Sequence, residues 1–597
     1  MMKKLIPLIA SVAVLVPLFF MHSCANTTEA PTGGLKDTIP PYIIDINPLP
    51  GAVNVPLKNA RFIFTFNEYV SVKTPANIVL SPPQLHPFKT RMQGKNLVVI
   101  VDEEEELLPN TTYTITFTDA IADVNEGNMF PGFSYVFSTG EHIDSMMVTG
   151  TVRDCNTLSP FKGATVMLYK DLSDSALFLH RPDAATKTDD WGYFRLPFVA
   201  DTTYRLYAIK DEANNFIYDP ENDLVAFVDS IIRPVIVVND TLPEMLNYEM
   251  TDTLSCQERR SEHELILFRE KPTKQYLKNE MRTADRAAYI TFMAPNAWVD
   301  TMWISGFRND QLITEFNLQQ DSMLIWVNSR KAMPDTLHLY VNYRKTDSLG
   351  VLKPELEHKK LFIEGKAKTR NTYQARKNIK HTDTICVMKV KAVPETVEQE
   401  GISIEFDYPV INESFDSLKF ISINTRQRQN AEKYTVERDS LNLRRYVIRP
   451  SAKLQKGFEY VLKVPHRAFR DINGFYSDST EVKVSLPSDD KLSTLVLEMG
   501  NVDRKIIVDL LDEKDATVRS YVIDKDTRLE FPYLKTGKYS VRVTEDSNRN
   551  SLVDVGSVLE HRQPEKVVFY QRDGKKFIDI PEGAEISQTI DLNILLK

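Results

Sequence analysis

Short runs in which apolar and polar residues alternate cover most of the chain, and Pro, Asn, Asp and Gly separate them. Examples are Arg61 to Phe66 and Tyr113 to Phe117. A period of two places alternate side chains on opposite faces of a strand. Many such runs with frequent turn residues predict an all-β fold of tandem β-sandwiches rather than helices or βαβ units. We expect only short connecting helices, one of them near Lys274 to Arg286.

The amino terminus departs from this pattern. Lys3 and Lys4 precede an apolar run from Leu5 to Met21, which only Ser11 interrupts with a polar side chain. A basic start, an apolar run and a small residue, Ser23, just before the expected cleavage site predict a secretory signal peptide over residues 1–23. The alternatives are a transmembrane helix, which two prolines disfavour, and ordinary secretion with a free Cys24.

Cys24 lies directly after the apolar run, where the lipobox of bacterial lipoproteins places its acylated residue. This resemblance implies lipidation of Cys24, and each buried methylene of an acyl chain adds about 0.8 kcal/mol to membrane binding. Residues 24–39 then form a polar, lipidated tether. We expect attachment to the outer membrane. The sequence leaves open which side of the outer membrane the chain faces. Surface export in Bacteroidetes-type bacteria is associated with an acidic run right after the lipidated cysteine, and here only Glu29 is acidic in that stretch.

The chain contains an internal repeat. The residues Phe62 to Val70 match Ile402 to Val410, and two later segments match in the same order at nearly the same spacing. The later pairs are Leu108–Tyr113 with Leu454–Tyr460, and Ala120–Gly127 with Ala468–Gly474. One duplicated module explains this order.

These segments resemble the bacterial Ig-like domain, with copies at 40–140 and 387–487. The segment from Gly33 to Pro41 resembles the opening of Ig-like lipoproteins from Bacteroidetes-type bacteria. That resemblance implies a non-enzymatic envelope scaffold that binds another envelope protein, as an accessory of the outer-membrane protein assembly machinery.

A second module type follows each Ig-like copy. Val148–Val152, Gly163–Leu168, Lys187–Phe194 and Tyr204–Ala208 resemble the prealbumin-like sandwich of carboxypeptidase regulatory-type and Cna B-type domains. We place these modules at 146–240 and 488–597. Residues 241–386 remain as one further β domain and linker, to which we assign no family.

Charge narrows the choice of partner. The chain carries a formal charge of −9, and removal of Lys3 and Lys4 would make it about −11. This acidic balance argues against nucleic acid as a partner. Lys366 to Lys380 form a basic stretch that is either a solvated linker or a docking strip for an acidic partner. Glu103 to Glu106 are expected in a solvated turn.

One loop has the spacing of a calcium site. Asp546, Asn548, Asn550 and Asp554 place oxygen ligands at the first, third, fifth and ninth positions. The counterpart Asp211 to Asp219 has Ala213 in place of one ligand. The alternative is an Asx-rich loop whose side chains bond their own backbone. Calcium is therefore the one candidate cofactor.

Other chemistry is sparse. Cys155, Cys256 and Cys386 are widely spaced and are expected to be buried, although one pair could form a disulfide. No catalytic motif stands out, so we expect a non-enzyme. A surface adhesin or glycan-binding protein is the alternative function, which exposed tryptophans would support. A hydrolase site in the unassigned middle domain is a third.

Overall fold

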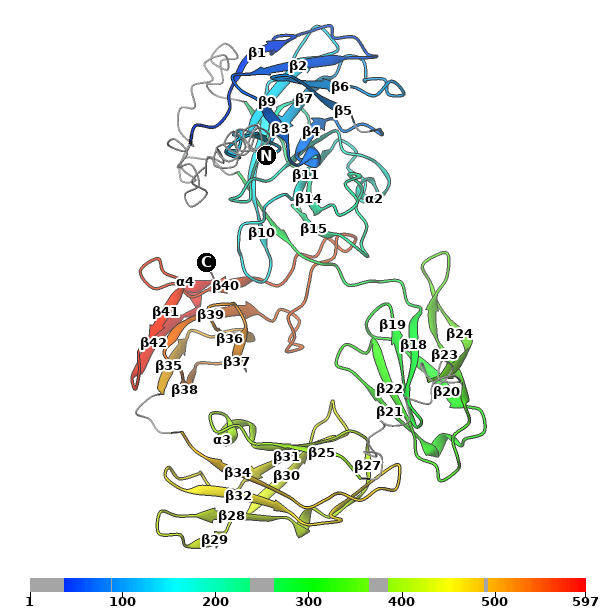
Figure 1. Cartoon of the computed structure of the whole chain (residues 1–597), viewed down its shortest axis with the longest axis vertical. Helices are drawn as coiled ribbons and strands as arrows, with labels where there is room; N and C mark the ends of the chain where they lie inside the picture. The colour runs from blue at the N-terminus through cyan, green and yellow to red at the C-terminus, as the bar shows by residue number, and fades with distance from the viewer. Residues whose placement is uncertain (1–36, 87, 237–261, 364–384, 488–491, 597) are drawn as a thin grey trace, which may run out of the picture.

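The computed structural model describes residues 37–86, 88–236, 262–363, 385–487 and 492–596. As predicted, these residues form an all-β fold of successive sandwich modules (Figure 1). Short helices such as α2 (Ala176–Leu179), α3 (Val397–Glu400) and α4 (Leu592–Leu595) connect or end strands. Within the described ranges, no helix has the length and apolarity needed to cross a membrane.

The first module packs a four-stranded sheet, in the order β1-β2-β6-β5, against β4-β7-β9, with β3 paired to β8. Its strands are β1 (Ile43–Asn47), β2 (Arg61–Phe66), β3 (Val70–Val72), β4 (Ile78–Ser81), β5 (Lys89–Gln93), β6 (Asn96–Ile100), β7 (Thr112–Phe117), β8 (Ile121–Asp123) and β9 (Phe133–Ser138). The alternation in β2 buries Phe62, Phe64 and Phe66 against Tyr135 and Phe137. This interior is therefore largely aromatic.

The fourth module repeats this topology. Its sheets run β25-β26-β31-β30 and β29-β28-β32-β34, with β27 paired to β33, so that only β29 is additional. Its strands are β25 (Met388–Lys391), β26 (Ile402–Phe406), β27 (Val410–Glu413), β28 (Lys419–Ile423), β29 (Gln429–Ala431), β30 (Tyr434–Arg438), β31 (Arg445–Pro450), β32 (Glu459–Val464), β33 (Phe469–Asp471) and β34 (Thr480–Ser485). In both modules a buried tyrosine hydroxyl, of Tyr113 or Tyr460, accepts the backbone N–H five residues earlier. The repeat therefore extends to local contacts.

The second module consists of the sheets β13-β10-β16 and β12-β11-β14-β15, with β17 added beside β10. Its strands are β10 (Met146–Asp154), β11 (Thr165–Tyr169), β12 (Ala184–Lys187), β13 (Tyr193–Val199), β14 (Arg205–Lys210), β15 (Leu224–Phe227), β16 (Val235–Ile236) and β17 (His263–Leu267). Because β17 pairs in parallel with β10 and buries Leu265 and Leu267, the expected boundary at residue 240 is too early. This module includes residues up to about 271.

The fifth module has the same plan, with sheets β38-β35-β42 and β37-β36-β39-β40 and a parallel pair between β35 and β42. Its strands are β35 (Ser493–Gly500), β36 (Ile506–Leu511), β37 (Thr517–Ile523), β38 (Thr527–Leu534), β39 (Gly537–Glu545), β40 (Val567–Phe569), β41 (Phe577–Ile580) and β42 (Glu585–Asp591). The parallel last strand in both modules shows that they share one architecture.

The third module is a sandwich of β18-β19-β22-β21 and β20-β23-β24. Its strands are β18 (Leu277–Ala284), β19 (Ala287–Phe292), β20 (Val299–Ile304), β21 (Leu312–Phe316), β22 (Ser322–Val327), β23 (Thr336–Thr346) and β24 (Leu352–Phe362). The expected helix near Lys274 to Arg286 is wrong. Residues with good helix propensity form β18 there, since pairing with β19 overrides local preference.

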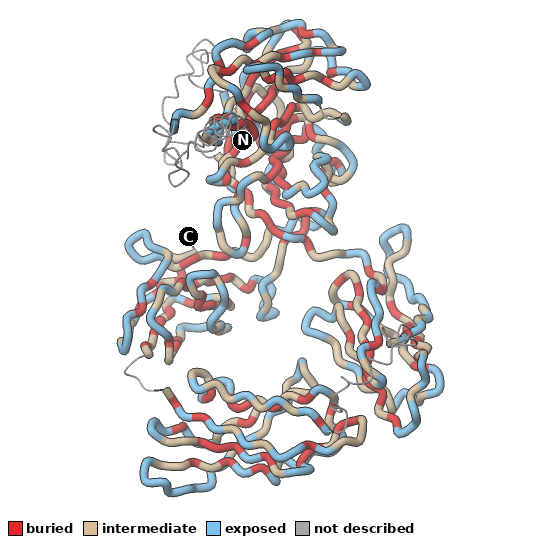
Figure 2. The backbone as a smooth tube through the Cα atoms, in the orientation of Figure 1, coloured by how far each residue is buried: buried red, intermediate tan, exposed pale blue. Residues whose placement is uncertain are grey.

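Each module has its own buried core (Figure 2). Smaller contacts join the modules. The first contacts the second through Ser81 and Ala185, and the third contacts the fourth through Trp326 and Ile472. Tyr533 of the fifth donates to Glu398 of the fourth over 3.1 Å. A hairpin of the fifth module, Val555–Gln563, then returns to the second module and completes a ring (Figure 1).

Candidate functional sites

The predicted calcium loop follows β39 and is organised by its own backbone. The carboxylate of Asp546, 2 % exposed, accepts the N–H groups of Asn550 and Ser551 at 3.0 and 2.8 Å. The side-chain oxygen of Asn550 accepts the N–H of Leu552 at 2.7 Å. These are the hydrogen bonds that the Asx-rich alternative expects.

The counterpart loop after β14 has the same conformation. Asp211 accepts the N–H groups of Asn215 and Phe216 at 3.1 and 2.8 Å, and Asn215 accepts that of Ile217 at 2.9 Å. In each loop the residues three and five positions after the aspartate have positive φ. The two loops therefore repeat one backbone design, which places side chains at equivalent positions.

Two lysines contact the carboxylates of the fifth-module loop. The ammonium of Lys505 lies 3.4 Å from Asp546 and donates to the carbonyl oxygen of Arg549 at 2.8 Å. Lys271, from the second module, donates to Oδ1 of Asp554 at 2.8 Å. Sequence reasoning missed both lysines because each is distant in sequence from the loop.

Asp554 is hydrogen-bonded to two of the other three predicted ligands, Asn548 and Asn550. Its Oδ2 accepts the side-chain amides of Asn548 and Asn550 at 2.7 and 2.5 Å. Partial burial raises the pKa of Asp554, but Lys271 and the two amides outweigh this effect, so its pKa lies below the ordinary value. The carboxylate is thus held ionised by protein donors.

Asp546 stays apart from this group, bound to backbone and Lys505. Across the described ranges, no set of three or more His, Cys, Asp or Glu side chains is grouped as metal ligands would be. A calcium ion would have to displace the amide donors and the lysine from these oxygens. Calcium binding by Asp546, Asn548, Asn550 and Asp554 stays a prediction.

The outer face of β20, β23 and β24 in the third module carries a stack of rings. Trp303 stacks on Tyr340 with ring centroids 5.1 Å apart, and Tyr340 stacks on His358 at 4.5 Å. Leu352, Leu356 and Phe362 of β24 are 55, 54 and 60 % exposed. Because buried residues of β23 alternate with Tyr340, these side chains share the solvent side. We call this surface the aromatic face.

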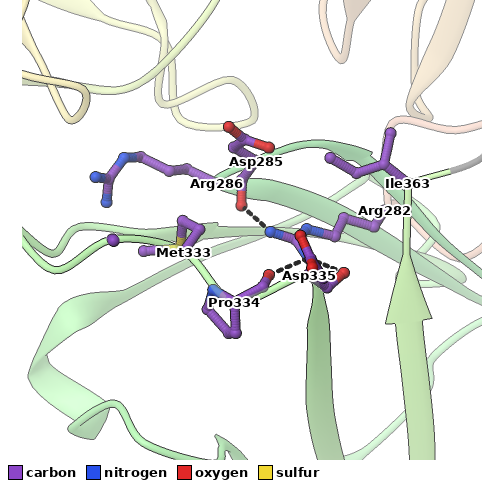
Figure 3. A pocket seen from close by; sticks show the side chains of 8 residues that line it. Arg282, Asp285, Arg286, Met333, Pro334, Asp335 and Ile363 are labelled. Carbon is purple, nitrogen blue, oxygen red and sulfur yellow. Dashed lines mark hydrogen bonds between the residues drawn. The ribbon is translucent and has the colours of Figure 1, made fainter. Parts of the chain in front are cut away.

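A pocket of about 360 Å³ opens between two turns of the third module (Figure 3). Arg282, 2 % exposed, donates to the carbonyl oxygens of Pro334, Asp335 and Asp285 at 2.9, 3.0 and 2.8 Å. Burial lowers the pKa of its guanidinium. Since these donors bind backbone, the arginine fastens the turns together.

The remaining predicted residues have varied outcomes. Cys155 and Cys386 are buried free thiols, and burial raises their pKa values to about 11 and about 12. Cys24, Cys256 and the basic stretch 366–380 lie outside the described residues. The acidic run 103–106 is a mostly exposed turn, although Glu105 contacts His86.

The tryptophans differ in how far their side chains are exposed. Trp191 and Trp298 are 59 and 68 % exposed. Trp326 is buried between the third and fourth modules, where the guanidinium of Arg444 lies 5.4 Å from its ring centroid. Exposure could not be read from the sequence, because it depends on the sheet edges and turns that surround each ring.

A family model described as a bacterial Ig-like domain matches residues 37–139, which confirms the Ig-like resemblance of this segment. No curated protein matches the chain. Among solved structures, the major pilin subunit of Bacillus cereus is 10% identical with a TM-score of 0.15, covering 75% of this chain and 99% of its own. The Bacillus anthracis TIE protein is 9% identical with a TM-score of 0.13, covering 94% and 76%. Likeness at this level carries no argument about function.

Proposed function

We propose that the protein is a non-enzymatic scaffold of the cell envelope, anchored by a lipid on Cys24, that presents a protein-docking surface. The finer proposal is an accessory subunit of the outer-membrane protein assembly machinery. The observation that carries the scaffold role is the aromatic face of the third module. The family resemblance of the leader and Ig-like copies supports the finer role.

The aromatic face has the composition of a protein contact surface. Trp, Tyr and Arg are enriched at binding hot spots, and contiguous exposed apolar side chains mark interaction sites. Trp303 and Tyr340 are held in place by stacking on each other, so these two side chains would lose little conformational entropy when a partner binds. Leu356 and Phe362 would supply apolar area beside them.

Affinity purification from detergent-solubilised membranes tests this role. We expect stoichiometric co-purification with an outer-membrane barrel protein, and its loss in the double variant Leu356→Asp with Phe362→Asp. Leu318→Asp is the matched control, since Leu318 is 51 % exposed in the turn that joins β21 to β22, which belong to the other sheet of the same module. Equal recovery of the partner with both variants would show that the aromatic face does not bind it.

The lipid anchor has a separate test. Cys24→Ala should move the protein from the membrane to the soluble fraction, because the acyl chains supply the membrane affinity. Metabolic labelling with a fatty-acid analogue should mark the wild-type chain and leave the variant unmarked. A variant that stays membrane-bound would contradict the anchor.

The exposed rings of Trp191 and Trp298 favour a second candidate, an adhesin or glycan-binding protein. An exposed indole face can stack on the apolar face of a sugar ring. In that case the chain should be retained on polysaccharide columns without a protein partner, and Trp298→Ala should shorten the retention. Trp326 is buried and offers no such face. The number of tryptophans in the sequence therefore does not decide between a scaffold and a glycan-binding protein.

A further inference from the structure

We infer that the second module carries a docking surface for the fifth module of the same chain, and that the hairpin Val555–Gln563 closes the second to fifth modules into a ring. We call this segment the closing hairpin. The inference goes beyond the proposed scaffold role and holds whether or not Cys24 is lipidated. It rests on contacts between residues nearly three hundred positions apart.

The centre of the contact is a buried carboxylate of the second module. Glu270, 8 % exposed, accepts the backbone N–H of Val558 at 2.9 Å and the hydroxyl of Tyr218 at 2.9 Å. Tyr218 and Val558 are each 2 % exposed. A buried carboxylate without such donors costs several kcal/mol, so the surface is built to receive a polar group from the hairpin.

Packing beside this carboxylate is close. A Cβ added at Gly556 would lie 2.5 Å from the ring of Phe268 and 2.6 Å from the carbonyl oxygen of Arg562. Val558 belongs to the same apolar cluster as Phe268, Phe227 and Cys155 of the second module. The hairpin thus packs against the edge of the hydrophobic core of the second module.

Polar contacts surround this centre. Lys271 pairs with Asp554 at 2.8 Å, His561 lies 3.1 Å from Asp174, and the amide of Gln563 donates to the carbonyl oxygen of Phe227 at 3.1 Å. On the other side, Leu158 of the second module packs against Leu511, Val567 and Phe569. An apolar centre with a polar rim is the anatomy of a specific interface.

The closing hairpin has a regular local structure. Ser557 and Arg562 exchange two backbone hydrogen bonds of 2.7 and 2.9 Å, which define a short antiparallel turn. The Asx loop of Asp546 and Asn550 precedes the hairpin and fixes the direction in which it leaves β39. These hydrogen bonds lie within the fifth module and do not depend on the second, so they would lower the entropy cost of closure.

Zero-length carbodiimide cross-linking of the purified full chain tests the closure. The reagent joins an ammonium and a carboxylate in direct contact, so Lys271 and Asp554 should yield a cross-linked peptide. The internal reference is the pair Lys576 and Asp515, 3.0 Å apart within the fifth module. Absence of the Lys271–Asp554 peptide while the reference forms would overturn the inference.

Val558→Asp should lower the yield of the Lys271–Asp554 peptide at least fivefold, because a charge cannot enter the apolar cluster. Val553→Asp is the matched control, since Val553 is 39 % exposed and lies just before the hairpin. An unchanged Lys576–Asp515 yield shows that the fifth module of each variant is folded. Equal yields from both variants would contradict the inference.

Mixing isotope-labelled and unlabelled chains separates closure within one chain from exchange between copies. Cross-linked peptides should be wholly labelled or wholly unlabelled. Mixed-isotope peptides would show that the surface receives the hairpin of a second copy, which overturns closure in cis. Small-angle scattering should also show a larger radius of gyration for Val558→Asp than for Val553→Asp.

Discussion

The second and fifth modules share their strand order, a parallel last strand and an Asx loop, yet the chain takes a different course after that loop. In the second, Asp223 accepts the N–H groups of Glu212 and Asp219, and the chain turns directly into β15. In the fifth, the chain continues through the closing hairpin before β40. A loop design preserved in both copies thus became a module contact in one. Two modules with one strand order therefore differ in whether the segment after the loop contacts another module.

Substitutions in the core that the two modules share should cause the largest loss of stability. Phe194 and Phe531 are fully buried in the second and fifth modules, so Phe194→Ala and Phe531→Ala should each destabilise their own module by about 3–5 kcal/mol. Denaturant unfolding followed by hydrogen exchange reports each module separately. Phe577→Ala, at a 36 % exposed position, should cost far less. Similar costs for all three would contradict the shared core.

The Asx loops provide the next test. Asp211→Ala and Asp546→Ala each remove an acceptor of two backbone N–H groups and should cost about 1.5–3 kcal/mol. The loss should be greater at Asp546, because its removal also leaves Lys505 without that partner. The conservative variants Asp211→Asn and Asp546→Asn should recover part of the stability. A greater loss at Asp211 would reverse the comparison.

Calcium would distinguish the loops sharply. If the Asp546 loop binds calcium in the folded state only, free calcium at ten times its Kd should stabilise the fifth module by about 1.4 kcal/mol. The second module should not respond, since Ala213 replaces a ligand. Thermal melts with calcium and with chelator measure this shift. Identical melts would leave the Asx loop as a purely structural element.

The smallest expected effect concerns the ion pair between Lys271 of the second module and Asp554 of the fifth. Lys271→Met should cost less than about 1 kcal/mol, because the lysine is 40 % exposed. Since the folded-state pKa of Asp554 is lowered, its contribution is present above the unfolded pKa of about 3.9 and is lost as the pH falls through the folded value. The difference in stability between wild type and Lys271→Met should therefore shrink below about pH 4. A difference that grows on acidification would contradict this assignment.

Local patterns predicted much of the fold. The alternation in Arg61 to Phe66 located a buried strand, and the paired motifs of the repeat located two modules with one topology. Long-range pairing was not predictable. The strand β17 was assigned to the wrong domain because 26 residues separate it from β16, and β18 was taken for a helix because its residues have high helix propensity.

The candidate sites were predicted less fully. Spacing identified the loop of Asp546 and its counterpart, since an Asx loop is local in sequence. Lys271, Glu270 and the ring stack of Trp303 depend on contacts between distant segments, and a single sequence carries no signal for these. The duplicated loop with a longer return in its second copy was the one available clue to the closing hairpin.

The position of the hairpin also sets an order in time. A chain made from its amino terminus can complete the sheets of the second module once β17 has emerged, and domains generally fold in that order. Glu270 and Phe268 then stay uncovered until Val558 is synthesised. Through that interval the apolar side chains of the second module that pack against Val558 are exposed to solvent, and synthesis of the fifth module ends that exposure.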